Sequence, residues 1–172
     1  NNPVFSSGAT ANFAENGTGT VYTAVATDAD GDTPTYHLVG GADQALFDID
    51  SSSGALTFKS APDYETPTDA SSPPDNVYEV QIEARDGNGG TASQTVSITV
   101  TNSNEAPVFT SSANVSAPEN QVETGYIPAA ADADGDTVTF SIVGGVDANQ
   151  FELDGSSGEL KFKQAPDFEN PT

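Results

Sequence analysis

Carboxylates spaced two residues apart are the residues of this sequence that could do chemistry. Asp28 and Asp30 form one such pair, and Asp63 and Glu65 form another. In an extended or loop segment this spacing directs both side chains the same way, so the two carboxylates converge on one volume. Like charges this close repel each other, and a bound cation turns the repulsion into attraction. The spacing therefore predicts cation sites, with solvated turn acids as the alternative.

A site that offers only oxygen ligands, with no thiolate and no cluster of imidazoles, favours a hard cation. Ca²⁺ takes about six to eight oxygen ligands. The chain has no Cys, and His37 is its only His, which argues against zinc or copper. The string from Asp28 to Asp32 resembles the start of an EF-hand loop. However, Thr33 and Val39 stand at the sixth and twelfth positions, where that loop needs Gly and Glu.

The composition excludes several kinds of partner. The chain has 26 Asp and Glu against 4 Lys and Arg, a formal charge of −22. It cannot present the basic face that nucleic acids or anionic membranes require. No apolar run approaches the roughly 18 residues of a membrane span, so we expect no direct membrane insertion. The acidity by itself is equally consistent with a protein that is merely kept soluble or adapted to salt.

An internal repeat organises the chain. Residues 3–68 and 107–172 align without gaps at a constant offset of 104, with 35 identities in 66 positions. The segment Asp28–Asp32 recurs as Asp132–Asp136, and Asp63 and Glu65 recur as Asp167 and Glu169. Residues 69–103 have no counterpart in the second copy. We therefore predict a complete repeat at 1–103 and a partial repeat at 104–172 that lacks its last two strands.

The elements that must position these acids are predicted to be short strands. Val77–Arg85 and Thr95–Thr101 alternate apolar and polar residues with the period of two that marks half-buried strands. Further strands are expected at 21–26, 35–39, 46–49 and 56–59, with equivalents near 126–131, 139–143, 151–153 and 160–163. The polar segment 66–76, with three prolines, is expected to be an exposed loop. About seven short strands in about 100 residues are typical of an all-β Greek-key sandwich. Without its last two strands, the second copy should have an open edge and an uncovered core.

Several motifs, taken in order, resemble cadherin repeats. They are Pro118-Glu119-Asn120 (Ala14-Glu15-Asn16 in the first copy), Asp-Ala-Asp-Gly, Asp-Tyr/Phe-Glu and Asn104-Glu105-Ala106-Pro107-Val108-Phe109. The resemblance spans essentially the whole chain and is strongest to the tandem cadherin-like repeats of large bacterial surface proteins.

The resemblance implies Ca²⁺ at the junction of successive repeats and a half-site at each end. The implied ligands are, at the junction, Glu15, Asp63, Glu65, Asn102, Asn104 through its carbonyl, Glu105, Asp132 and Asp134; at one end, Asp28, Asp30 and Asp86; and at the other, Glu119, Asp167 and Glu169. Asn102 stands where the family usually has Asp.

The implied function is that of a calcium-rigidified extender or adhesion segment of a secreted or cell-surface protein. Its partners would be adjacent repeats of the same polypeptide, joined through Ca²⁺, with any cell-surface or polysaccharide ligand bound elsewhere in the parent protein. A calcium-dependent carbohydrate-binding module or a homotypic binding module is the alternative. We expect no enzymatic activity, because glycosidase acids usually flank a cleft with aromatic platforms and this chain has no Trp.

Overall fold

The computed structural model describes residues 1–170. The chain divides into two compact units, which meet between Ser103 and Asn104. Each unit is described by itself below. No helix in the described part of the chain is long and apolar enough to span a membrane.

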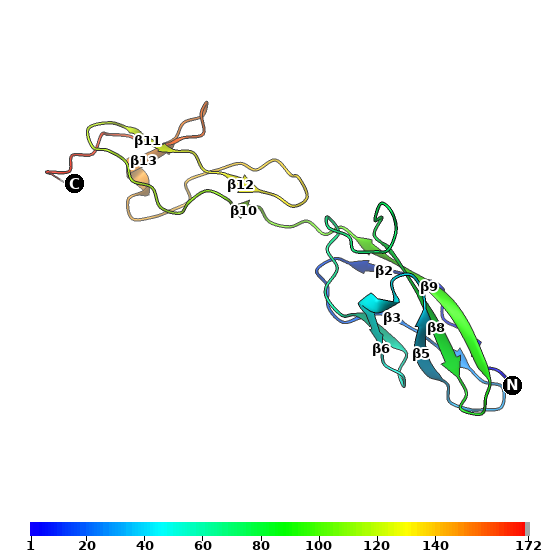
Figure 1. Ribbon diagram of the computed structural model, residues 1–172. Coiled ribbons are helices and arrows are strands. Elements are labelled where there is room, and N and C mark those ends of the chain that lie inside the picture. Colours follow the sequence, from blue (N-terminus) through cyan, green and yellow to red (C-terminus); the bar gives the residue numbers. More distant parts are fainter. Residues whose placement is uncertain (171–172) are drawn as a thin grey trace. The chain divides into compact units, whose positions relative to one another are not determined.

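Unit 1 contains two main β-sheets and one short two-stranded pair (Figure 1). The larger sheet has the strand order β2–β9–β8–β5, with β2 at Thr10–Ala14, β9 at Thr91–Thr101, β8 at Val77–Arg85 and β5 at Thr35–Gly40. The smaller sheet has the order β3–β7–β6, with β3 at Thr20–Thr23, β7 at Ala55–Phe58 and β6 at Phe47–Ile49. A short pair is formed by β1 at Val4–Phe5 and β4 at Ala26–Thr27. The β2–β9 pairing is parallel, and the other pairings are antiparallel.

The core of unit 1 follows from the alternation of apolar residues along its strands. Tyr78, Val80 and Ile82 on β8 are at most 1% exposed, and Val96, Ile98 and Val100 on β9 are equally buried. They meet Phe47 and Leu56 of the smaller sheet in one cluster. The Phe58 ring is tilted against the Phe47 ring, with centroids 4.2 Å apart, and lies edge-on to the Tyr78 ring, with centroids 5.2 Å apart. Such aromatic contacts each contribute about 0.5–1.5 kcal/mol beyond area burial. The prediction of an all-β sandwich is confirmed.

Unit 2 has the smaller sheet of this fold and lacks a larger one among its described residues. Its three-stranded sheet has the order β11–β14–β13, with β11 at Glu123–Tyr126, β14 at Leu160–Phe162 and β13 at Phe151–Leu153. A second pair joins β10 at Val108–Phe109 to β12 at Ala130–Ala131. The only helical segments in residues 1–170 are two short 3₁₀ turns, η1 at Gln44–Leu46 and η2 at Ala148–Gln150.

Some predicted strands have different limits or do not form. The predicted strand at 21–26 is split between β3 and β4, because the chain leaves one sheet and pairs with β1 in another; the segment 126–131 is split in the same way. Leu46 lies in η1 rather than in β6. The predicted strand at 139–143 is wrong. Its counterpart β5 pairs with β8, and unit 2 has no such partner among its described residues.

Candidate metal centre

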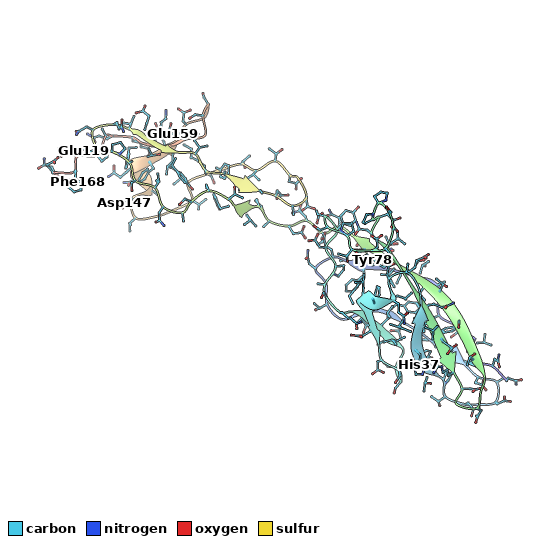
Figure 2. The ribbon with its side chains drawn as sticks, viewed as in Figure 1. His37, Tyr78, Glu119, Asp147, Glu159 and Phe168 are labelled. Atoms are coloured by element: carbon cyan, nitrogen blue, oxygen red, sulfur yellow. The ribbon has the colours of Figure 1, made fainter. Side chains whose placement is uncertain are left out.

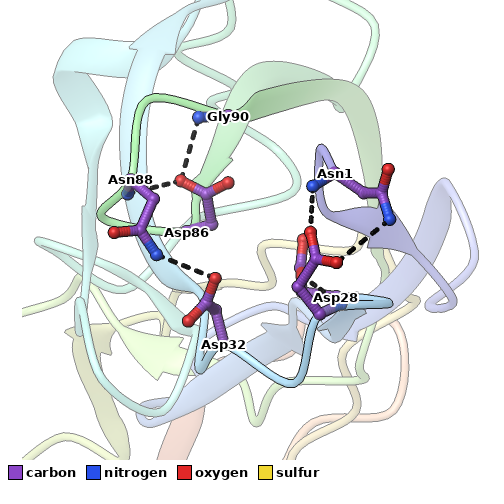
Figure 3. A network of polar contacts seen from close by, with 7 residues as sticks. Asn1, Asp28, Asp32, Asp86, Asn88 and Gly90 are labelled. Atoms are coloured by element: carbon purple, nitrogen blue, oxygen red, sulfur yellow. Dashed lines mark hydrogen bonds and ion pairs between the residues drawn. The ribbon is translucent and has the colours of Figure 1, made fainter.

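The first group of acids lies where β4, the β8–β9 turn and the start of unit 1 meet (Figure 3). Asp28 follows β4, and its Oδ1 accepts a hydrogen bond of 2.7 Å from the Asp30 backbone N–H. Asp86 follows β8, and its Oδ1 accepts the backbone N–H groups of Asn88 and Gly90 at 2.7 and 2.9 Å. The structure thus brings together the predicted set of Asp28, Asp30 and Asp86 at one end of unit 1.

Two observations at this end test whether a cation fits. Asp28 Oδ2 is buried and has no hydrogen-bond partner in the described structure. At Gly90, an added Cβ would lie 2.2 Å from Asp86 Oδ2 and 3.0 Å from both the Asn1 carbonyl oxygen and Asn2 Oδ1. Three oxygens therefore converge on one small volume that only glycine leaves open. An all-oxygen set of this kind suits Ca²⁺ or another hard cation.

A side-chain contact ties Asp30 to the start of unit 1, because the Asn1 side-chain amide donates to the Asp30 carboxylate at 3.3 Å. Asp32 Oδ2 accepts a hydrogen bond of 2.8 Å from the Asn88 side-chain amide.

The second group in unit 1 is organised by Glu15. This residue is 3% exposed, which is unusual for a carboxylate. Its Oε2 accepts the Tyr64 backbone N–H at 2.8 Å, and its Oε1 accepts the Ser103 backbone N–H at 2.9 Å. Tyr64 stands between Asp63 and Glu65, so Glu15 holds that acidic pair and the end of unit 1 together. Each carboxylate oxygen keeps a second lone pair for another ligand.

Two more predicted ligands extend this second group. The Asn102 side-chain amide donates to Glu65 Oε1 at 3.0 Å. Asp63 Oδ1 accepts the Thr66 backbone N–H at 2.8 Å, which fixes the turn that follows the pair. Glu15, Asp63, Glu65 and Asn102 are thus linked through direct contacts or a shared turn.

In unit 2, the predicted ligands near its start also contact each other. The Glu105 backbone N–H donates to Asp134 Oδ2 at 2.8 Å, and the Asn104 side-chain amide donates to the Glu105 carbonyl at 2.8 Å. Asp132 Oδ1 accepts the Asp136 backbone N–H at 3.2 Å. The role of the Asn104 carbonyl as a calcium ligand stays a prediction.

The last group repeats the Glu15 arrangement. Glu119 Oε2 accepts the Phe168 backbone N–H at 2.9 Å, as Glu15 does with Tyr64. One carboxylate oxygen from each of Glu119, Asp167 and Glu169 lies within 4.8 Å of the others, and all three residues are exposed. Hydrogen bonds from the Asn170 side chain and from the backbones of Asn170 and Glu169 lower the pKa of Asp167. The carboxyl group of Asp167 is therefore ionised at neutral pH.

Sequence reasoning missed several participants. Asn1 and Asn2 each supply an oxygen to the volume beside Asp86, and Gly90 leaves that volume open. The glycine-rich turn after Asp86 was the sequence feature that could have indicated this volume. The backbone N–H groups of Tyr64 and Ser103 could not have been identified from residue type, because every residue except proline has one. His37 is half-buried on β5, and its Nε2 lies 3.3 Å from the Thr35 hydroxyl (Figure 2).

Comparison with known proteins identifies the family. A family model described as the cadherin domain matches residues 9–101, which is more than half of the chain. The chain belongs to the cadherin domain family. Cadherin domains are typical of extracellular adhesion proteins and are not enzymes. The predicted resemblance is therefore confirmed.

The sequence of the chain is also similar to those of individual proteins. It is 37% identical over 90 residues to halomucin of Haloquadratum walsbyi (strain DSM 16790 / HBSQ001), covering 50% of this chain and 1% of that protein. It is 30% identical over 158 residues to mouse protocadherin Fat 2, covering 87% of this chain and 3% of that protein. The chain thus spans a small part of these relatives.

Solved cadherin structures share the fold. Human protocadherin-24 EC1-2 (form II) has a TM-score of 0.58 at 21% identity, covering 95% of this chain and 80% of that one. Mouse cadherin-23 EC22-24 has a TM-score of 0.53 at 20% identity, covering 98% and 56%. At these identities the likeness is one of fold.

Proposed function

We propose that this chain is a calcium-binding segment of a secreted or cell-surface adhesion protein. The observation that carries the proposal is the end of unit 1 where Asp28 Oδ2 is buried without a partner and three further oxygens surround the open side of Gly90. A buried carboxylate oxygen without a partner is costly, and a bound cation removes that cost. When bound, Ca²⁺ supplies positive charge and demands several oxygen ligands at once.

The residues have distinct tasks in this proposal. Asp28, Asp30 and Asp86 would hold the ion at one end of unit 1, and the Asn88 and Gly90 N–H groups keep Asp86 oriented. Glu119, Asp167 and Glu169 would form the corresponding set at the far end of unit 2. The repeated bonds of Glu15 to Tyr64 and of Glu119 to Phe168 support a common design for the two units.

The order of motifs along the chain supports an extender role. The short segment 101–106 would be a flexible hinge, and the acids that flank it would repel each other. We propose that Ca²⁺ bound by Glu15, Asp63, Glu65, the segment 102–105, Asp132 and Asp134 stiffens this segment. Adjacent repeats of the same polypeptide are then the primary partners.

A calcium titration tests the proposal. Adding Ca²⁺ to the chelator-treated chain should raise its Tm, because a ligand that binds only the folded state stabilises it. Isothermal titration should give dissociation constants of about 10⁻⁴–10⁻³ M or somewhat tighter, as for extracellular modules. An unchanged Tm together with no binding heat would exclude the proposal.

Gly90→Ala tests the site at the end of unit 1. The new Cβ would enter the oxygen-lined volume beside Asp86, so we expect calcium affinity there to fall about tenfold or more, as for changes around other metal ligands. Gly8→Ala is the matched control, because a Cβ at Gly8 would meet nothing within 4 Å. Equal calcium affinity in the two variants would contradict this assignment.

A further inference from the structure

The acids proposed to hold the cation at the Asp86 end of unit 1 come from two segments, 28–34 and 86–90. Between these segments, β5 and β8 pair in a ladder whose last partners are Thr35 and Arg85. Residues 28–34 directly precede Thr35, and Asp86 directly follows Arg85. The ladder therefore stops just before the residues that a cation would draw together, and something else must fix their separation.

One side-chain hydrogen bond joins the two segments beyond the ladder (Figure 3). The Asn88 side-chain amide donates to Asp32 Oδ2 at 2.8 Å, across 56 positions of the sequence. No other hydrogen bond connects 28–34 with 86–90 in the described part of the chain. Asp32 is half-buried there. This bond is thus the contact that sets how closely the two segments approach each other.

Asp32 is held in a fixed relation to Asp28 by the turn that separates them. The Asp30 backbone N–H donates to Asp28 Oδ1 at 2.7 Å, and the Gly31 N–H donates to the Asp28 carbonyl at 3.3 Å. These two bonds close a turn that begins at Asp28, and Asp32 follows it directly. A displacement of Asp32 would therefore be passed to the acids of its own segment.

The second segment is a turn with a defined interior and a flexible attachment. Asp86 Oδ1 accepts the Asn88 and Gly90 backbone N–H groups, and the Asp86 N–H donates to the Gly90 carbonyl at 3.2 Å. Gly87 and Gly89 have φ values of +81° and +105°, a region in which glycine moves freely. The turn keeps its internal bonds, but its glycines allow it to hinge against the sheet.

Asn88 connects this turn to Asp32 through two hydrogen bonds in series. Its backbone N–H donates to Asp86 Oδ1, and its side chain donates to Asp32 Oδ2. The other oxygen of Asp86 borders the volume that Gly90 leaves open. A shift of Asn88 would therefore move the carboxylate that contributes to this volume. Partners that orient metal ligands in this way typically change metal affinity by about 10–100-fold when they are removed.

We propose that Asp32 is a positioning residue for calcium at the Asp86 end of unit 1. It would act through Asn88 on the orientation of Asp86, without being a ligand itself. This inference rests on the proposed calcium function. The role requires a hydrogen-bond acceptor at position 32, whereas a ligand would require the carboxylate.

Calcium titrations of the full, isotope-labelled chain test the proposal through the backbone amide signals of Asn88 and Gly90. Asp32→Ala should weaken calcium binding at this end about tenfold. Asp32→Asn keeps an oxygen that accepts the bond from Asn88, so most of the affinity should remain. Asp48→Ala removes an exposed acid on β6 and is the control for the loss of one charge, with calcium binding as in wild type.

Exchanging the two residues gives a second test. Asn88→Asp alone places a carboxylate opposite Asp32 and should weaken binding, because repulsion replaces the hydrogen bond. The double variant Asp32→Asn, Asn88→Asp restores a donor or acceptor on each side with the original net charge, and it should recover most of the lost affinity. The combination of Asp32→Ala with Asn88→Ala should weaken binding no more than either change alone, because both remove the same bond.

The outcomes separate this inference from the calcium proposal. If the wild-type signals of Asn88 and Gly90 do not respond to Ca²⁺, both are overturned at this end of unit 1. If wild type responds and Asp32→Ala binds equally well, only the positioning role is overturned. Equal losses in Asp32→Ala and Asp32→Asn would also overturn it, because they would indicate a ligand or a purely electrostatic effect. The amide signals of β8 and β9 in chelator report whether each variant is folded.

Discussion

At the scale of single residues, one aspartate in each unit holds the turn between two strands of the smaller sheet. Asp50 Oδ1 accepts the backbone N–H groups of Ser52 and Ser53 at 3.0 and 2.7 Å. Asp154 Oδ1 accepts those of Ser156 and Ser157 at 3.0 and 2.8 Å. Hydrogen bonds from Ser53 and Ser52 lower the pKa of Asp50, and those from Ser157, Lys161 and Ser156 lower the pKa of Asp154. The ionised form of each residue is thus the form that stabilises the turn.

This arrangement makes a prediction for acid stability. Because the pKa of Asp50 is lower in the folded chain than its usual value of 3.8, the unfolded chain binds the proton first. The stabilising effect is complete above the unfolded pKa and is lost as the pH falls through the folded pKa. Asp50→Ala should therefore lower the Tm of unit 1 at about pH 7, and the difference from wild type should shrink toward about pH 2.

Thermal melts at a series of pH values measure this effect. Asp48→Ala is the control, because Asp48 is exposed on β6 and its one ion-pair contact, to Lys59, is long at 3.9 Å. A Tm difference for Asp50→Ala that stays constant with pH would show that the turn does not depend on its charge.

The types of the site residues could be predicted from the sequence, but their supporting contacts could not. The spacing of Asp63 and Glu65 indicated a shared direction, whereas the hydrogen bond from the Tyr64 N–H between them to Glu15 joins residues 49 positions apart. The buried state of Glu15 depends on the fold, as does the position of Asn2 beside Asp86. Local spacing carries no information about such long-range approaches.

At the scale of elements, two buried carboxylates organise the long segment between β7 and β8. Asp69 is 5% exposed and accepts the backbone N–H groups of Ser71, Asp75 and Asn76. Burial raises the pKa of Asp69, but these hydrogen bonds outweigh burial and lower it overall. Asp43 accepts a further N–H from Ala70 at 2.6 Å. The segment predicted as an exposed loop is therefore anchored from inside at Asp69.

Removing this anchor should destabilise unit 1. Asp69→Ala leaves three backbone N–H groups without their acceptor, and we expect the free energy of unfolding to fall by about 1–3 kcal/mol. Urea denaturation followed by tyrosine fluorescence measures the change, with the exposed Asp48→Ala as control. Unfolding midpoints that coincide for the two variants would show that water replaces the lost acceptor at no cost.

The strands with strict alternation were predicted best. β8 has the predicted limits, and β9 contains the predicted segment at 95–101. β2 was not predicted, because Thr10–Ala14 has no clear apolar run and becomes a strand through its parallel pairing with β9. The segment 139–143 is the opposite case. Its sequence has a strand pattern, but it forms no strand because, within residues 1–170, no neighbouring strand is there to share backbone hydrogen bonds with it.

At the scale of the whole molecule, the net charge of −22 sets the response to salt. In the presence of a chelator we expect the Tm to rise between about 0.01 and 1 M NaCl, because the screening length falls from about 30 to 3 Å and the carboxylates repel less. With saturating Ca²⁺ the rise should be smaller, since bound ions already neutralise the clusters. Scanning calorimetry measures the slope of Tm against NaCl concentration with chelator and with Ca²⁺. Equal slopes would mean that calcium does not neutralise the charge of the carboxylate clusters.

The parallel pairing of β2 with β9 has a mechanical consequence for unit 1. Five residue pairs join these strands, from Thr10 opposite Ser97 to Ala14 opposite Thr101. Because the strands run in the same direction, a force that pulls the start of β2 and the end of β9 apart slides one strand along the other. All five pairs then bear the load together, whereas an antiparallel pair pulled from one end opens one bond at a time. Tension along the chain is thus resisted by this ladder in shear.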